Sequence, residues 1–231
     1  DGKRMFFWGG HENHIPPKEH SDRYAEAYRA AGINVMRHLG HSEMITDPET
    51  GEIDPELMDD FFYLVHKLGQ NGVYFMMSHT YGYVGRHKKF GKAGPAIYGY
   101  PRGQVPTLDH HLVIFTDPKV REGQKKFWKR LLTTVNPYTG KALKDDPTLI
   151  GFELANETGL NPRYFDYNRL DPAGRASSDR WRELFDRFLL AKYGDAAKLA
   201  EAWAQEPLFR WEDPAQNTVP IPWRFRGERV W

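Results

Sequence analysis

Short apolar runs alternate with amphipathic helical patterns over the first two thirds of the chain. The runs at residues 5–8, 33–38, 73–78 and 148–156 are bounded by turn residues and have the length of buried strands. Between them, apolar residues recur at the three- and four-residue spacing of helices that bury one face. Strands that alternate with helices are typical of a parallel sheet wrapped by helices. The pattern therefore predicts an α/β protein built from four βα units.

Start and stop signals accompany the helical patterns. Gly32 is expected to end the first helix, and Asp54-Pro55 begins the second with an N-cap and a first-turn proline. Asp117-Pro118 begins the third, and a serine at 177–178 is expected to cap a later helix that ends at Gly194. The buried face of the second helix is expected to carry Leu57, Phe61, Leu64, Val65 and Leu68, and that of the later helix Trp181, Leu184, Phe185, Phe188 and Leu189.

Polar side chains stand where the predicted strands end. Arg37 and His38 close the second strand, His79 follows the third, and Asn156-Glu157 follows the fourth. Because the carboxyl ends of parallel strands meet at one edge of a sheet, these side chains are expected to converge there. Glu153 lies four residues before Glu157, on the same side of the strand. It is either a core carboxylate paired to Arg37 or a residue of an interior layer of side chains, and we favour the structural pairing.

The lead-in to the fourth strand is the most specific motif in the chain. Asn136-Pro137-Tyr138-Thr139-Gly140 is followed by Asp145-Asp146-Pro147 and then by an apolar run that ends in Asn156-Glu157. This order resembles the fourth strand of the retaining glycoside hydrolases built on (β/α)8 barrels, including the family-5 cellulase-like and mannanase-like enzymes and the barrel β-galactosidases. The resemblance implies that the chain comes from a glycosidase, with Glu157 as general acid/base and Asn156 holding the sugar's 2-hydroxyl. It also implies that Arg37 hydrogen-bonds the nucleophile and keeps it ionised.

A substrate cleft is expected beside this edge of the sheet. The segment at about 80–116 is rich in Gly, Pro, Tyr and His and is too long for an ordinary connection, as is typical of loops that shape clefts. Trp8, at the expected end of the first strand, and Tyr81 are suited to stack on sugar faces, with core packing as the alternative for each. His79 and His38 either line the cleft or make structural hydrogen bonds.

The second half of a barrel is not evident in the sequence. The tail at 206–231 is rich in aromatic residues but shows no fifth strand followed by a helix, so we expect one domain over 1–231 that is the N-terminal half of a barrel. Retaining glycosidases need two carboxylates about 5 to 5.5 Å apart. The resemblance implies a nucleophile on a seventh strand, so the nucleophile is not identified in this chain. The alternative is a half-barrel that binds glycan without cleaving it, or that assembles with itself or another half-barrel through its open sheet edges.

Charge and composition narrow the choice of partners to an oligo- or polysaccharide. The formal net charge of +1 provides no basic field for nucleic acid. The sequence has no cysteine, and its 10 histidines lack the His-x-x-x-His spacing of a zinc hydrolase, so we predict neither a metal nor a cofactor. No apolar run approaches the roughly 20 residues of a membrane span. Analogy with the resembled group, whose members often act outside the cytoplasm on polymers, is the sole basis for expecting a secreted or periplasmic location.

Overall fold

A computed structural model describes residues 4–12, 14–39, 45–47, 49–78, 116–153, 172–203 and 212–219. The chain divides into two compact units, and each is described by itself. The first unit consists of Asp1–Val105 and Pro118–Glu157, and the second of Pro106–Asp117 and Thr158–Trp231. One domain over 1–231, with a cleft loop and an aromatic tail, stays a prediction.

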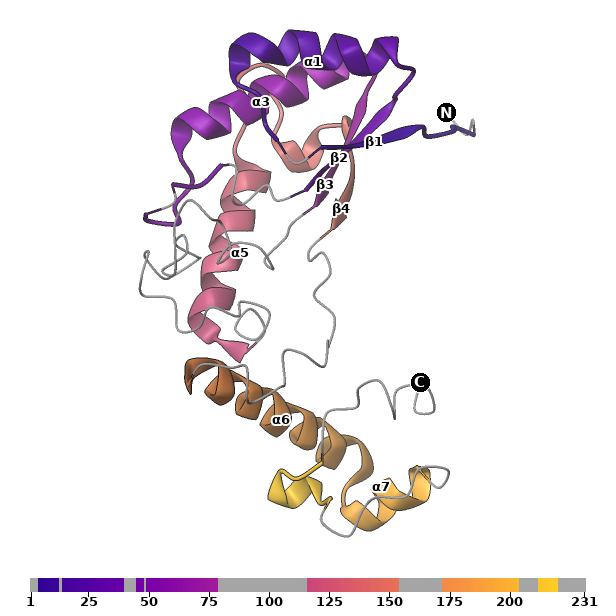
Figure 1. Ribbon diagram of the computed structural model, residues 1–231, viewed down its shortest axis with the longest axis vertical. Helices are drawn as coiled ribbons and strands as arrows, with labels where there is room; N and C mark the ends of the chain where they lie inside the picture. Colours follow the sequence, from indigo (N-terminus) through magenta and orange to yellow (C-terminus); the bar gives the residue numbers. More distant parts are fainter. Residues whose placement is uncertain are drawn as a thin grey trace. The chain divides into compact units, whose positions relative to one another are not determined.

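The first unit is built on a parallel sheet of four strands in the order β1-β2-β3-β4 (Figure 1). The strands are β1 (Gly9–Glu12), β2 (Val35–Leu39), β3 (Tyr74–Ser78) and β4 (Leu149–Glu153). The register pairs Glu12 with His38, Leu39 with Ser78, and Ser78 with Glu153, so all four carboxyl ends lie at one edge. Four parallel strands in chain order confirm the predicted α/β class.

The first strand lies four residues later than the sequence predicted. The apolar run at 5–8 was expected to be the strand, yet Phe6 is 81% exposed and Trp8 is 71% exposed, and the strand begins at Gly9. The Gly9-Gly10 pair forms the beginning of the strand and packs closely against β2. A Cβ atom on Gly10 would lie 2.5 Å from the sulfur of Met36, so a larger residue would not fit without a shift.

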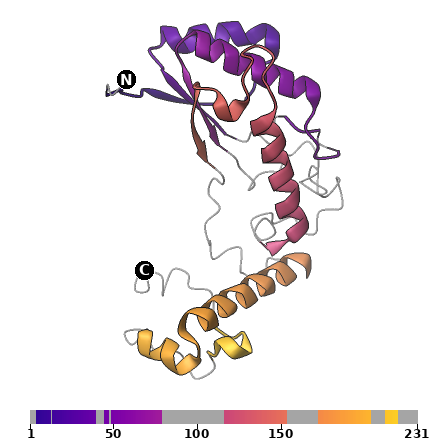
Figure 2. The same cartoon turned by 180° about the vertical axis from the view of Figure 1, so that it is seen from behind.

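Among its described residues, the first unit contains the helices α1 (Lys18–Ala30), α3 (Pro55–Gln70) and α5 (Pro118–Thr133). Helices α1 and α3 lie side by side over the sheet in both views (Figures 1 and 2). The N-cap predicted at Asp54 is confirmed, because its side chain accepts hydrogen bonds from the backbone N–H groups of Glu56 and Leu57. The predicted stripe is wrong at Leu57, which is 36% exposed. A short 3-10 helix, η3 (Leu143–Asp145), precedes β4.

The helices cover one face of the sheet and leave the other more open. Met36 and His38 in β2 and Phe75 and Met77 in β3 are all buried, whereas Arg37, Tyr74 and Met76, which alternate with them, are more accessible. The ring of Phe61 in α3 lies 5.6 Å from that of Phe75, between centroids. On the same side, the rings of Trp128 in α5 and Phe152 in β4 lie 4.4 Å apart. We call the opposite side, which carries Arg37, the open face.

The second unit contains α6 (Pro172–Tyr193), α7 (Ala196–Ala202) and the 3-10 helix η5 (Pro214–Gln216). Its core is formed by Leu189, Leu199 and Val219. The predicted cap at 177–178 is wrong, because α6 begins at Pro172 and encloses Ser178. Proline suits the first turn of a helix, and this signal was overlooked. Phe188, expected in the buried stripe, is 55% exposed.

Candidate active site

Each of the four strands contributes one side chain to a hydrogen-bonded network on the open face. We call His11, Arg37, Ser78 and Glu153 the carboxyl-end network. Nη2 of Arg37 lies 2.5 Å from Oε2 of Glu153 and donates to Oγ of Ser78 at 3.1 Å. Nη1 of Arg37 lies 3.1 Å from Nδ1 of His11. The hydroxyl of Ser78 also donates to Glu153. Arg37 thereby joins three neighbouring side chains across the sheet.

The network keeps Glu153 ionised. Burial alone would raise the pKa of Glu153, but the hydrogen bond from Ser78 and the ion pair with Arg37 outweigh it and hold the pKa below its usual range. The side chains of Arg37 and Glu153 are 29% and 30% exposed, so water screens their attraction only in part. The predicted pairing of Glu153 with Arg37 is confirmed. Because the guanidinium is a donor, its contact with His11 requires Nδ1 of that ring to be unprotonated.

Four of the predicted site residues lie outside the described residues. These residues are His79, Tyr81, Asn156 and Glu157. The nearest described residues in sequence are the ends of the two strands, Ser78 in β3 and Glu153 in β4. The register pairs these two strand ends directly. The roles given to the four residues stay predictions, and the network provides the described structure next to them.

His38 and Trp8 are placed elsewhere than the sequence suggested. His38 is fully buried on the helix-covered face, where its ring lies 5.2 Å from that of Phe75. Of the two alternatives for His38, this burial favours the structural one. Trp8 precedes β1, so it lies at the amino ends of the strands, and its expected place at the end of the first strand is wrong. Its backbone N–H donates to Oδ1 of Asn34 at 2.7 Å.

Two members of the network, His11 and Ser78, were not recognised as site residues from the sequence. His11 lies in β1, beyond the run at 5–8 that was predicted to be the first strand. If Gly9-Gly10 is read as part of an edge strand, His11 is in line with Arg37, and the register pairs these two residues. Ser78 was placed at a strand end without a partner. Its even separation from Met76 puts it on the face of Arg37, and that parity was the available signal.

The motif ahead of β4 has a structural role. Nδ2 of Asn136 donates to the backbone oxygen of Phe62 at 2.9 Å, and Oδ1 accepts from the backbone N–H of Tyr138. The hydroxyl of Tyr138 donates to Asp59 at 2.7 Å, and Asp59 also pairs with Lys18 at 2.8 Å. These contacts attach the turn before β4 to α3 and so position the strand that carries Glu153.

The described residues contain neither a metal site nor a membrane-spanning helix. No group of three or more His, Asp or Glu residues in the described ranges could hold a metal ion. In the same part of the chain, no helix is both long and apolar enough to cross a membrane.

Comparison with known proteins agrees with the resemblance that the sequence motifs indicated. No family model matches the chain. It is 29% identical to mannan endo-1,4-beta-mannosidase 4 of Solanum lycopersicum over 173 residues, and the aligned part covers 71% of this chain and 41% of that protein. It is 28% identical over 138 residues to mannan endo-1,4-beta-mannosidase 1 of Arabidopsis thaliana, covering 57% of this chain and 30% of that one. Among solved structures, the endo-beta-1,4-mannanase from Thermotoga petrophila matches with a TM-score of 0.49 and 20% identity, over 82% of this chain and 41% of that chain.

The curated relatives confirm the resemblance to glycoside hydrolases of the mannanase-like kind. Both relatives carry the name of an enzyme that acts on mannan. The chain spans less than half the length of these relatives.

Proposed function

We propose that the chain forms the acid/base half of a retaining glycosidase that acts on β-linked polysaccharide, with β-1,4-mannan as the substrate. The sequence similarity to mannan endo-1,4-beta-mannosidases supports the class of substrate. The observation that carries the proposal is the carboxyl-end network, because it brings Arg37 and Glu153 together at the edge where Asn156-Glu157 follows β4. Polar side chains at the carboxyl ends of parallel barrel strands are typical of active sites.

In this proposal Glu157 acts as general acid and then as general base. The protonated carboxyl of Glu157 gives its proton to the glycosidic oxygen while the bond from that oxygen to the anomeric carbon breaks. A second carboxylate, not identified in this chain, attacks the anomeric carbon and forms a glycosyl ester. Water then attacks the same carbon, its proton passes to the carboxylate of Glu157, and the nucleophile is released. Asn156 holds the 2-hydroxyl of the sugar.

The other predicted residues support this chemistry by charge and shape. Arg37, fixed by Glu153, supplies a positive charge that favours the ionised form of a nearby nucleophile. His79 and Tyr81 follow β3 and are proposed to line the cleft. The burial of His38 and the position of Trp8 at the amino ends leave these two residues out of direct sugar contact in the proposal.

Substitution of the acid/base residue tests the proposal. Glu157→Gln in a protein extended through the reading frame that follows residue 231 should lower turnover on β-1,4-mannan by about 10²–10⁴-fold, because general-acid assistance is lost. Aryl glycosides with good leaving groups should lose less in the glycosylation step, because they need no proton. Glu201→Gln on the exposed surface of α7 is the matched control and should keep full activity. Equal activity of Glu157→Gln and the control would remove Glu157 from the mechanism.

A second candidate is a half-barrel that binds glycan without hydrolysing it. One observation favours it, because Glu153, which the described residues place at the strand ends on the open face, is held by Arg37 and Ser78. A carboxylate engaged in this way is a poor nucleophile. This candidate predicts that the 231-residue chain binds manno-oligosaccharides and releases no product, and that an extended protein is equally inactive.

A further inference from the structure

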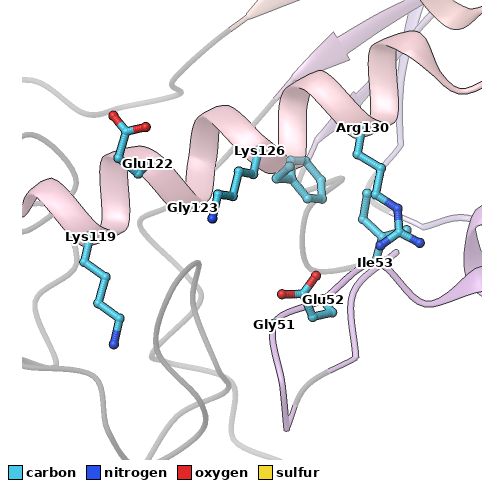
Figure 3. A pocket seen from close by; sticks show the side chains of 9 residues that line it. Gly51, Glu52, Ile53, Lys119, Glu122, Gly123, Lys126 and Arg130 are labelled. Carbon is cyan, nitrogen blue, oxygen red and sulfur yellow. The ribbon is translucent and has the colours of Figure 1, made fainter.

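A groove in the first unit lies between α5 and the segment 51–53, and it has a volume of about 280 Å³. The buried side chains of Ile53 and Phe127 contribute apolar surface to it. Exposed charged groups from both sides line the rest of the groove. Figure 3 shows three cations of α5 projecting to the same side of the helix, with Glu122 on the other side. The charged residues that line the groove are Lys119, Glu122, Lys126 and Arg130 from α5 and Glu52 from the opposite wall.

The wall opposite α5 is held in one conformation by hydrogen bonds. Oδ1 of Asp47 accepts from the backbone N–H groups of Glu49 and Thr50, each at 2.8 Å, and this lowers the pKa of Asp47. The backbone N–H of Asp54 donates to the oxygen of Ile45 at 2.9 Å. Glu52 is therefore carried on a fixed turn.

The three cations form a single row along α5. Lys126 and Arg130 lie seven and eleven residues after Lys119, and at about 100° per residue the three side chains leave the helix within about 20° of the Lys119 direction. The row is about 16 Å long at 1.5 Å per residue. Lys126 and Arg130 form no ion pair with any described residue. Lys125, off the row, is the residue that pairs with Glu122, at 2.7 Å.

Two features of the groove work against the stability of α5. Gly123 lines the groove in the interior of the helix, where glycine costs about 1 kcal/mol relative to alanine. Lys126 and Arg130 are like charges four residues apart, an arrangement that costs a helix about 0.2–0.5 kcal/mol. Residues that lower the stability of a helix and lie together at one groove are typical of functional sites.

We propose that this groove binds a carboxylate-bearing oligosaccharide, that is, a glycan segment that contains uronic acid residues. Arg130 and Lys126 suit carboxylate groups, and a guanidinium can bind one with two parallel hydrogen bonds. Glu52 accepts hydrogen bonds from sugar hydroxyls, and the apolar surface of Phe127 and Ile53 suits the C–H patches of a sugar ring. The length of the row matches an extended chain rather than a single small anion.

The charge pattern argues for a saccharide over nucleic acid. The chain as a whole carries a net charge of only +1, which provides no basic field for a phosphate backbone. The choice of a saccharide rests on the proposed function, in which the protein acts on a polysaccharide. Neutral mannan has no group that would pair with the cations Lys126 and Arg130, so the groove extends the substrate class to glycans with acidic residues.

Calorimetric titration of the 231-residue chain with an oligogalacturonate, a neutral manno-oligosaccharide, sulfate and duplex DNA tests the proposal. The oligogalacturonate should bind, and the double substitution Lys126→Gln with Arg130→Gln should weaken its binding at least tenfold. Lys129→Gln, an exposed lysine off the row, should leave the affinity within twofold. Gly123→Gln should weaken binding by filling the groove while it raises the melting temperature, so a loss cannot be ascribed to unfolding.

Three results would overturn the proposal: undetectable oligogalacturonate binding, unchanged binding by the double variant, or sulfate or DNA binding as tight as that of the oligogalacturonate. Failure of the proposed function is separately visible. Glu157→Gln should not alter oligogalacturonate binding, and the double variant of an extended protein should hydrolyse unsubstituted mannan at the unsubstituted protein's rate.

Discussion

Glu153 in the first unit is a partly buried carboxylate, and Asp186 in the second is a fully buried one. Their surroundings shift their pKa values in opposite directions. Glu153 meets Arg37 and Ser78 at the sheet edge, and its pKa is held below the usual range. Asp186 is fully buried in α6, and burial raises its pKa to about 6, with the backbone of Val219 and the charge of Arg182 offsetting only part of the effect. Burial alone therefore favours the neutral form of a carboxyl group, and a nearby cation or hydrogen-bond donor favours the ionised form.

The comparison distinguishes a carboxylate with a cation and a hydroxyl beside it from a buried carboxylate whose partners offset only part of the effect of burial. In the first unit the parallel register places a cation and a hydroxyl beside the carboxylate, so the network is ionised whenever the strands are paired. In the second unit the nearby charge of Asp213 adds to the effect of burial. We expect the first arrangement to stabilise the protein at neutral pH and the second to destabilise it.

Without the Arg37 cation, burial should raise the pKa of Glu153, as it does for Asp186. Arg37→Met should destabilise the first unit by about 3 kcal/mol at pH 7, because a partly buried carboxylate loses its charged partner. The pKa of Glu153 is lowered in the folded protein, so its contribution is present above its unfolded pKa and is lost as the pH falls through its folded pKa. The loss should therefore shrink below about pH 4. Urea unfolding followed by hydrogen exchange of the strand amides measures both values.

Lys125→Met is the control for Arg37→Met, because it breaks the exposed pair with Glu122 and should change stability by less than about 0.5 kcal/mol. An Arg37→Met effect of equal size at pH 7 and pH 3 would contradict the ionised network.

Removal of the buried charge should have the opposite sign. Asp186→Asn should stabilise the second unit by about 2 kcal/mol at pH 8, because the folded pKa of about 6 lies above the ordinary value of 3.8. The folded state holds the proton more tightly, so wild-type stability falls as the pH rises from about 4 to 6, whereas asparagine stays neutral. Hydrogen exchange of α6 amides at pH 3.5 and pH 8 should show a gain only at the higher pH. A gain of the same size at both values would show that charge is not the cause.

Removal of the hydroxyl tests how the network divides its effect. Ser78→Ala should cost about 1 kcal/mol, because one hydrogen bond to a charged group is lost while the ion pair remains. The pKa of Glu153 should rise, but by less than in Arg37→Met. NMR titration of the Glu153 side-chain carboxyl carbon follows this directly. A larger rise in Ser78→Ala than in Arg37→Met would contradict the expectation that the guanidinium, through its hydrogen bond and its charge together, lowers the pKa of Glu153 more than the hydroxyl does.

The regular elements of the first unit were predictable where one local signal dominated. The second, third and fourth strands show apolar runs between turn residues, and α3 has an N-cap and a first-turn proline at Asp54-Pro55. The first strand was misplaced because Gly9-Gly10 supports two interpretations, a turn or a close approach of two backbones. Only the position of Met36 decides between them, and that is a tertiary contact.

The site was predictable in part for the same reason. Strand parity was sufficient to pair Arg37 with Glu153, but His11 depended on the misplaced strand. The raised pKa of Asp186 depends on how residues 212–219 pack against α6, and no local pattern encodes that packing.

The pH dependence of kcat/KM for β-1,4-mannan, measured on a protein extended beyond residue 231, tests the acid/base role of Glu157 most directly. The alkaline limb of this profile reports a group that must be protonated in the free enzyme. We predict that the rate falls on the alkaline side in the unsubstituted protein, and that Glu157→Gln lowers the rate and removes this limb. An alkaline limb that persists unchanged in Glu157→Gln, with full activity, would contradict the assignment of the carboxyl ends of these four strands to the acid/base half of a glycosidase.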